Sequence, residues 1–121
     1  MLLEMKLEAV EWFYMEIDHS MKNGKTISHD EVFEKTLDTA MRGMSDFEYM
    51  VWCFAIALRY ERANILMRES HAAELKTALD IYEKTDFISL GLSDAEITIL
   101  KRDYNTSKEY LKWLSNQRCQ M

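Results

Sequence analysis

Four glutamates occur as two pairs at a spacing that a magnesium site on helices would use. Glu8 and Glu11 are three residues apart, and Glu31 and Glu34 repeat that spacing further along the chain. Two acidic pairs on neighbouring helices could hold magnesium around the phosphates of a nucleotide, because carboxylate oxygens are preferred ligands of that ion. One candidate chemistry is therefore magnesium-assisted hydrolysis of a nucleotide.

The two pairs resemble the acidic motif of all-α nucleotide pyrophosphohydrolases, and that resemblance implies a magnesium-dependent enzyme. In that family the second pair ends in aspartate, where this chain has Glu34. At about 100° per residue, Glu8 and Glu11 also point away from the apolar stripe that begins at Leu3 and Leu7, whereas metal ligands in a bundle project inward. We therefore expect a solvated acidic face without metal or cofactor, and keep the enzyme as the alternative.

A second candidate metal site combines Glu16 and His19 with His71 and Glu74, each pair again three residues apart. This spacing occurs in di-metal carboxylate bundles, but those sites need two further inward-facing glutamates as bridging ligands. Glu16 and His19 also lie off the main apolar stripe of their helix. We therefore predict no metal site here.

Nucleophilic catalysis has no support in the sequence. No serine or cysteine stands in a recognisable motif with a histidine, and none of the three glycines belongs to a phosphate-binding loop. Cys53 falls within the apolar run 49–58 and is expected to be a small core residue. Cys119 is expected to be exposed. The protein is therefore predicted not to be an enzyme.

The first helix carries more apolar surface than one core face can use. Besides its main stripe, a second apolar face includes Met5, Ala9 and Trp12, and an acidic line runs between the two faces. A tryptophan and a methionine beside carboxylates are typical of a surface that binds another protein. The alternative is that this helix lies in a groove between two others and that both faces are core. The predicted partner-binding residues are Met5, Ala9, Trp12, Glu4, Glu8 and Glu11.

The charge of the chain argues against nucleic acid as a partner. Its formal net charge is −6, whereas binding to phosphates requires a basic surface. Residues 1–58 hold 11 acidic and 5 basic residues, and residues 59–121 hold 10 of each, so the first half carries all the net charge. Glu31, Glu34 and Asp38 extend the acidity to the second helix. A second alternative is therefore an acidic mimic of nucleic acid that inhibits a DNA-binding protein.

Helix-start signals predict the elements that position these residues. Three serines, each with a glutamate three residues later, form capping boxes at Ser28, Ser45 and Ser93. The chain has no proline and only three glycines, which favours a few long helices over many short strands. The expected helices cover about residues 2–22 and 29–42, then start near 46 and 70, and end with about 94–118.

Apolar periodicity assigns the faces of these helices. In the first helix, one apolar stripe at spacings of four and three is expected to face the core. The third helix is apolar on two opposite sides, which is typical of the buried centre of a bundle. A single helix from Met44 to Leu90 would be too long for this domain, so a break is expected at Ser70, as the N-cap of a fourth helix. The stripe expected in the core consists of Leu3, Leu7, Val10, Tyr14, Ile17 and Met21.

Together these patterns predict an all-α fold, a compact bundle of four to five helices around a buried central third helix. Residues 1–121 are expected to form a single α-helical domain. With neither a signal peptide nor a membrane-length apolar run, we expect a cytoplasmic protein that has no membrane partner. The predicted function is non-catalytic protein binding by a small adaptor, accessory subunit or inhibitor. Its partner would be another protein, or a second copy of the chain in a homo-oligomer.

Overall fold

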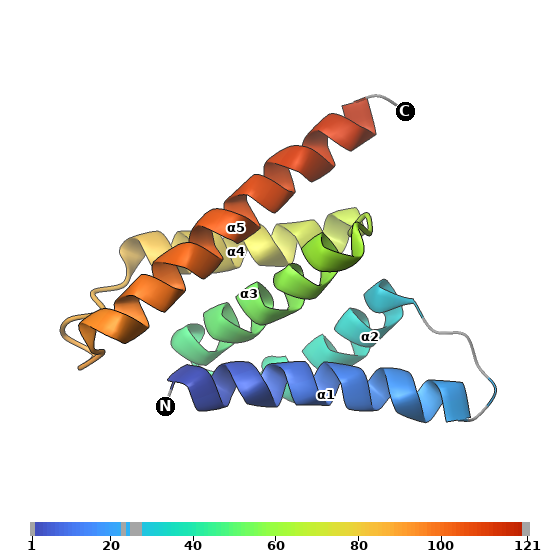
Figure 1. Cartoon of the computed structure of the whole chain (residues 1–121), viewed down its shortest axis with the longest axis horizontal. Coiled ribbons are helices and arrows are strands. Elements are labelled where there is room, and N and C mark those ends of the chain that lie inside the picture. Colours follow the sequence, from blue (N-terminus) through green and yellow to red (C-terminus); the bar gives the residue numbers. More distant parts are fainter. Residues whose placement is uncertain (1, 23, 25–27, 120–121) are drawn as a thin grey trace.

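The computed structural model describes residues 2–22, 24 and 28–119, except for the side chains of Ser20 and Met21. In chain order the helices are α1 (Leu2–Lys22), α2 (His29–Thr36), the π-helical turn η1 (Leu37–Met41), α3 (Asp46–Ala63), α4 (Glu69–Lys84) and α5 (Asp94–Cys119) (Figure 1). α3 packs against α1, α4 and α5 and lies between them. The predicted all-α bundle around a central third helix is confirmed. None of the helices in the described ranges is long and apolar enough to cross a lipid bilayer.

The three predicted capping serines each begin a helix. The side-chain oxygens of Ser28, Ser45 and Ser93 accept a hydrogen bond from the backbone N–H three residues further on, at 3.2, 3.3 and 3.2 Å. At the third start the box is reciprocal, because Glu96 Oε1 accepts from the backbone N–H of Ser93 at 3.0 Å. The predicted starts of α2, α3 and α5 are confirmed, since the interactions that set them are local.

The break between α3 and α4 comes earlier than predicted. Asn64 follows α3 in the left-handed conformation, with φ of 56°, which asparagine adopts more readily than most residues. α4 begins at Glu69, so Ser70 lies inside it, and the N-cap is Arg68, whose side chain makes no capping hydrogen bond. The predicted N-cap at Ser70 is wrong, because the left-handed asparagine ends α3 before that serine is reached.

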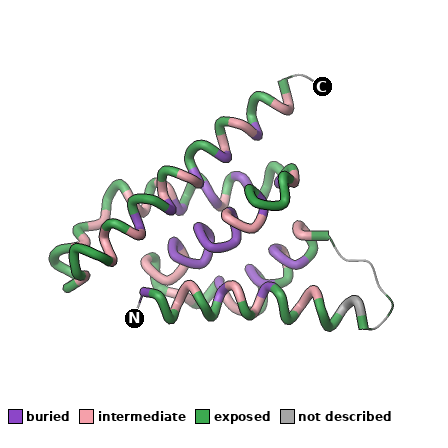
Figure 2. The backbone as a smooth tube through the Cα atoms, in the orientation of Figure 1, coloured by how far each residue is buried: buried purple, intermediate pink, exposed green. Residues whose placement is uncertain are grey.

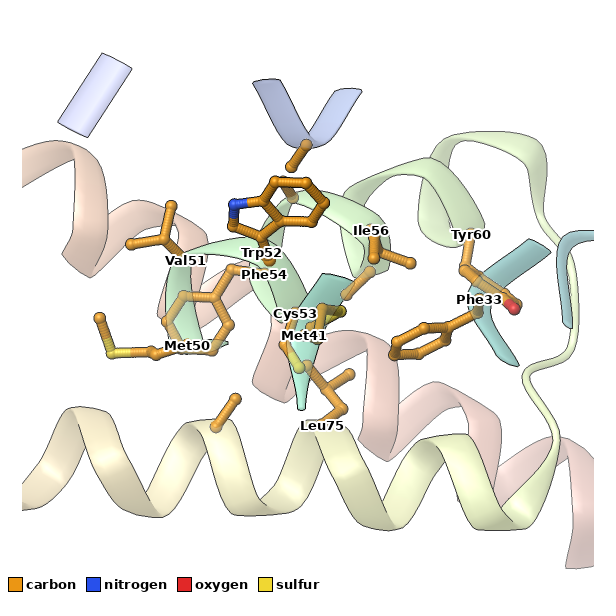
Figure 3. Close-up of a cluster of buried hydrophobic side chains, with 14 of the residues drawn as sticks. Phe33, Met41, Met50, Val51, Trp52, Cys53, Phe54, Ile56, Tyr60 and Leu75 are labelled. Atoms are coloured by element: carbon orange, nitrogen blue, oxygen red, sulfur yellow. The ribbon is translucent and has the colours of Figure 1, made fainter. Parts of the chain in front are cut away.

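The core is centred on α3. All residues from 50 to 57 are buried, and Figure 2 shows buried positions along most of this helix. Figure 3 shows Trp52 on the side of α3 that faces α1, while Leu75 comes from α4 on the other side. This burial around the helix is what its two apolar stripes predicted. Cys53 is buried and Cys119 is exposed, as expected.

α1 turns a different face to the core from the one predicted. Leu3 is 63% and Leu7 57% exposed, and Tyr14 is exposed too. Val10 and Ile17 are only partly buried against the core. Figure 2 shows exposed positions along the outer side of α1. The prediction that this stripe forms the core face is wrong; its last member, Met21, has a side chain outside the described part of the chain.

The face of α1 that packs is the second, aromatic one. Phe13 and Ala9 are each 1% exposed, and the Phe13 ring lies 5.3 Å from the His29 ring at the start of α2. The Trp12 ring likewise contacts an aromatic ring, that of Trp52 of α3. Aromatic rings bury more area than leucine and gain further from ring-to-ring contact, so this face displaces the aliphatic stripe from the core.

An ion pair joins α1 to α5. Lys6 Nζ lies 2.6 Å from Asp103 Oδ2, and Asp103 is buried. One turn nearer the start of α1, the backbone N–H of Leu2 donates to Glu96 Oε2 at 3.4 Å. The first part of α1 is therefore held against the first half of α5.

The connection between α3 and α4 is held by α5. Tyr110 Oη accepts from the backbone N–H of Met67 at 3.0 Å and donates to the carbonyl of Ile65 at 2.5 Å. Arg118 donates to the carbonyl of Met67. These bonds satisfy backbone groups that have no helical partner, so the geometry of the connection depends on the last helix.

Candidate protein-binding site

A groove of about 440 Å³ lies where α1 passes η1 and α3. Its size falls in the range of pockets that bury a ligand or the anchoring side chains of a peptide. Most of its lining is apolar, and both of its carboxylates come from α1. The lining residues are Glu8, Glu11, Trp12 and Met15 of α1, Ala40 of η1, Met44 of the following turn and Trp52 of α3.

Two tryptophans form one wall of the groove. The centres of the Trp12 and Trp52 rings are 6.3 Å apart, and the ring planes meet at 61°, an edge-to-face arrangement. Trp52 is only 5% exposed, whereas Trp12 is partly exposed. The Trp12 Nε1 atom is buried and makes no hydrogen bond within the described part of the chain. Such an edge-to-face pair favours one ring geometry, so this wall is formed before any partner binds.

Glu8 and Glu11 give the groove an acidic rim. Both side chains are exposed, and neither forms an ion pair with any residue in the described ranges. A carboxylate in water beside an apolar surface attracts a partner that carries basic residues next to apolar ones. The groove therefore combines an apolar wall with an unneutralised negative edge.

The structure brings Trp12, Glu8 and Glu11, three of the six predicted partner-binding residues, to this groove. Ala9 is buried and Met5 is partly buried against the core, because they share the face of α1 that packs on the bundle. Glu4 is exposed, but it does not line the groove.

Sequence reasoning missed the rest of the groove lining. Met15 is 55% exposed and lies one turn after Glu11, so its position on the same side of α1 could have been read from the spacing. Ala40, Met44 and Trp52 could not be found in this way. They reach the groove only because η1 and α3 pack against α1.

A buried histidine network lies between α2 and α4. The His71 side chain is 1% exposed, its Nδ1 lies 2.9 Å from Asp30 Oδ1, and its Nε2 lies 2.6 Å from Glu34 Oε2. Tyr60 Oη donates to the same Asp30 oxygen at 2.8 Å, and the backbone N–H of Arg68 does so at 3.1 Å. Each ring nitrogen of His71 therefore has a carboxylate oxygen within hydrogen-bonding distance.

Both carboxyls of this network are held in their ionised form. Burial alone would raise the pKa of Asp30, but hydrogen bonds from His71, the Arg68 backbone and Tyr60 together lower the pKa below its ordinary value. The His71 hydrogen bond lowers the pKa of Glu34. Because the histidine ring is enclosed, a substrate cannot reach it in the folded chain. The network therefore fastens α2 to α4. Sequence reasoning had considered His71 as a metal ligand or as a residue at the start of a helix, and missed this pairing.

A second cluster surrounds Glu74. Arg42 Nη1 lies 3.0 Å from Glu74 Oε1, and Tyr49 donates a hydrogen bond to the other carboxylate oxygen. Burial raises the pKa of Tyr49 and also raises the pKa of the Cys53 thiol. A buried thiol that stays protonated is a poor nucleophile, which agrees with the prediction that Cys53 is a core residue.

The structure does not bring the candidate metal ligands together. His71 and Glu74 make the contacts described above, and Lys35 Nζ lies 2.6 Å from Glu16 Oε2. Among the residues that the structure describes, no three histidine, cysteine, aspartate or glutamate side chains are arranged to hold a metal ion.

The acidic line on α2 is partly used within the chain as well. Glu34 is bonded to His71, and Glu31 accepts a hydrogen bond from the Ser28 hydroxyl at 3.4 Å. No contact among the described residues favours a nucleotide hydrolase or a nucleic-acid mimic over a protein that binds a partner through the groove.

No family model matches the chain, and no curated protein or solved structure is significantly similar to it. The proposal about function therefore rests on the groove of this chain and not on a relative.

Proposed function

We propose that the protein is a non-catalytic binding module whose groove takes a basic amphipathic helix of another protein. The observation that carries this proposal is the apolar groove of Trp12, Met15 and Trp52 with Glu8 and Glu11 along its edge. A helix that lays its apolar face into such a groove uses side chains one turn apart as anchors. Basic residues flanking these anchors would meet the two carboxylates.

Burial supports a binding role over a catalytic one. The histidine with two carboxylate partners is enclosed between helices, and the Cys53 thiol is buried with a raised pKa. Neither group can meet a substrate in the folded chain, whereas the groove is open to solvent along its acidic edge. Within this proposal the chain acts as an adaptor, an accessory subunit or an inhibitor, according to the partner that carries the helix.

A pair of synthetic helices tests the proposal. One is an amphipathic helix of leucine and lysine, and the other replaces each lysine with glutamate. Fluorescence anisotropy of the labelled peptides should show binding of the leucine–lysine helix and none of the leucine–glutamate helix. Met15→Lys should weaken binding about tenfold, because it places a cation against the basic edge of the peptide, and Glu8→Gln should weaken it about threefold.

Matched variants away from the groove separate this site from general attraction to an acidic protein. Leu66→Lys and Glu61→Gln alter exposed positions that do not line the groove. Both should leave the affinity for the leucine–lysine helix unchanged. If Leu66→Lys weakens binding as much as Met15→Lys does, the groove is not the binding site and the proposal fails.

A further inference from the structure

The apolar stripe of α1 that the bundle covers only in part has the spacing of a coiled-coil seam. Leu3, Leu7, Val10 and Tyr14 follow one another at intervals of four, three and four residues, the pattern of two helices that pack side by side. Leu3 and Leu7 are more than half exposed, and Tyr14 is exposed as well. Contiguous exposed apolar residues of this kind mark an interface more often than a free surface.

One edge of this seam is acidic. At about 100° per residue, Glu4, Glu11 and Asp18 follow the same edge, one residue after the seam positions Leu3, Val10 and Ile17. All three carboxylate side chains are exposed, and the described part of the chain supplies none of them with an ion-pair partner. This edge faces away from the bundle.

The other edge, where α1 meets the bundle, carries an arginine without a counter-ion. Arg59 of α3 donates through Nη1 to Tyr14 Oη at 2.9 Å, and its guanidinium carbon lies 5.2 Å from the centre of the Tyr14 ring. Its Nε is buried without a hydrogen-bond partner, and no carboxylate of the described residues lies within ion-pair distance. An unpaired, partly buried charge is unfavourable. A carboxylate from another chain would therefore stabilise this arginine.

These two edges match only when two copies of α1 run parallel. In a parallel pair related by a twofold axis, the acidic edge of each helix faces the opposite edge of the other. Glu11 and Asp18 of one copy then come to Arg59 of the other, level with Tyr14. In an antiparallel pair, the acidic edges of both copies would face each other and repel.

A hollow on the acidic edge offers space for that arginine. It has a volume of about 430 Å³, and its lining consists of Val10, Glu11, Tyr14, Met15, Asp18, His19 and Lys22. Its apolar groups suit the aliphatic stem of an arginine, and the carboxylates of Glu11 and Asp18 suit the planar charged end.

We propose that this stripe binds a second copy of the chain. The two α1 helices pair in parallel along Leu3, Leu7, Val10 and Tyr14, and Arg59 of each copy binds between Glu11 and Asp18 of the other. The apolar seam lies on a different side of α1 from the Trp12 groove, and the two surfaces share Glu11. The dimer does not depend on the function proposed for that groove.

Sedimentation velocity over a range of protein concentrations tests the apolar part of the interface. The chain should form a dimer, and Leu7→Asp should raise the dimer dissociation constant by about tenfold to a hundredfold, because a leucine leaves the interface. Ile88→Asp is the matched control, since Ile88 is an exposed apolar residue in the loop before α5. It should leave the dimer intact. A monomeric wild-type chain, or equal loss of dimer in both variants, would overturn the proposal.

Charge reversal tests the assignment of Arg59. The double change Glu11→Lys with Asp18→Lys should raise the dissociation constant about tenfold or more, since attraction becomes repulsion. Adding Arg59→Glu should restore part of the affinity, and circular dichroism checks that each variant folds. Reversal of Glu61 and Asp80, which are exposed elsewhere, should have little effect. Failure of Arg59→Glu to restore any affinity would refute the arginine contact.

A cysteine tests the direction of the helices. In a Cys119→Ser background, Leu3→Cys places a thiol at the start of the seam, where parallel helices bring the two copies of residue 3 together. Mild oxidation should then link the dimer covalently, while Ile88→Cys in the same background should stay unlinked. A dimer in solution that Leu3→Cys fails to link would refute the parallel arrangement.

Discussion

One carboxylate oxygen of Asp30 accepts hydrogen bonds from three sources. The donors are the His71 ring, the Tyr60 hydroxyl and the backbone of Arg68, so a single atom of α2 is shared by α3 and the start of α4. Phe33 packs its ring 4.7 Å from the His71 ring, which places the network beside the apolar core. Removing the histidine would leave Asp30 and Glu34 without their strongest donor.

At this scale we predict that His71→Gln lowers the free energy of unfolding by about 2–3 kcal/mol near neutral pH, because two carboxylates lose the ring that bonds them. Urea unfolding measures the change. His29→Gln is the control. The His29 ring makes aromatic contacts with Phe13 and Tyr60, and partial burial lowers the pKa of His29. A loss below about 1 kcal/mol for His71→Gln would show that the network contributes little.

The same network predicts how stability depends on acid. The pKa values of Asp30 and Glu34 are lowered from 3.8 and 4.5, the ordinary values of the two residue types. A carboxyl with a lowered pKa stabilises the fold above its ordinary pKa, and this contribution disappears as the pH falls through the lowered value. The difference in unfolding free energy between wild type and His71→Gln should therefore shrink from about pH 5 to about pH 2. A difference that stays constant over this range would contradict the proposed pairing.

At the scale of the element, the end of α3 depends on one backbone conformation. Asn64 has positive φ, its backbone N–H bonds back to the last turn, and the Ile65 N–H bonds to the carbonyl of Tyr60. This geometry turns the chain toward α4. It also positions residues 65–67, whose backbone is hydrogen-bonded by Tyr110 and Arg118 of α5.

We predict that Asn64→Ala lowers the free energy of unfolding by about 1 kcal/mol, because a Cβ without a polar side chain is disfavoured in the left-handed region. Asn64→Gly should be neutral or slightly stabilising, since glycine adopts this conformation freely. Thermal unfolding of the two variants compares them directly. If both were destabilised equally, the Asn64 side chain rather than its backbone angle would be responsible.

At this scale, sequence reasoning succeeded for features set by interactions within one helical turn and failed for those set by contacts between distant segments. The starts at Ser28, Ser45 and Ser93 were predictable because each cap lies within one helical turn. The face of α1 was not, since both of its stripes have helical spacing and the choice between them depends on rings from α2 and α3. Asn64 was readable in principle, because asparagine is the commonest non-glycine residue in that conformation.

The candidate site divides in the same way. Glu8, Glu11 and Trp12 could be placed at a surface because spacing alone puts a tryptophan beside an acidic line. Trp52 and Ala40 join them only after three segments have packed, and periodicity within one helix carries no information about that approach. The pairing of His71 with Asp30 is hidden for the same reason.

At the scale of the whole molecule, the Lys6–Asp103 ion pair joins the first helix to the last. Asp103 is buried and the Lys6 ammonium is its only ion-pair partner among the described side chains. A buried pair of this kind is costly to break on one side, since the remaining charge keeps its desolvation penalty.

We predict that Lys6→Met lowers the free energy of unfolding by about 3 kcal/mol, while Lys6→Met with Asp103→Leu recovers most of the loss. Denaturant unfolding of the single and double variants gives the coupling between them. Lys101→Met, on the exposed side of α5, serves as the control and should have little effect. A double variant as unstable as the single one would show that packing, and not an uncompensated charge, causes the loss.

The hold of α5 on residues 65–67 also has a consequence for the order of events while the chain is being made. Arg118 stands 51 residues after Met67, so at about 5–20 residues per second the ribosome needs roughly 3–10 s to supply it. During that interval the turn after α3 has no Tyr110 or Arg118 to satisfy its backbone. We expect trypsin to cut at Arg68 in nascent chains stalled before residue 110, and to spare this site once the last helix has emerged. Equal cleavage before and after its emergence would show that the turn closes without it.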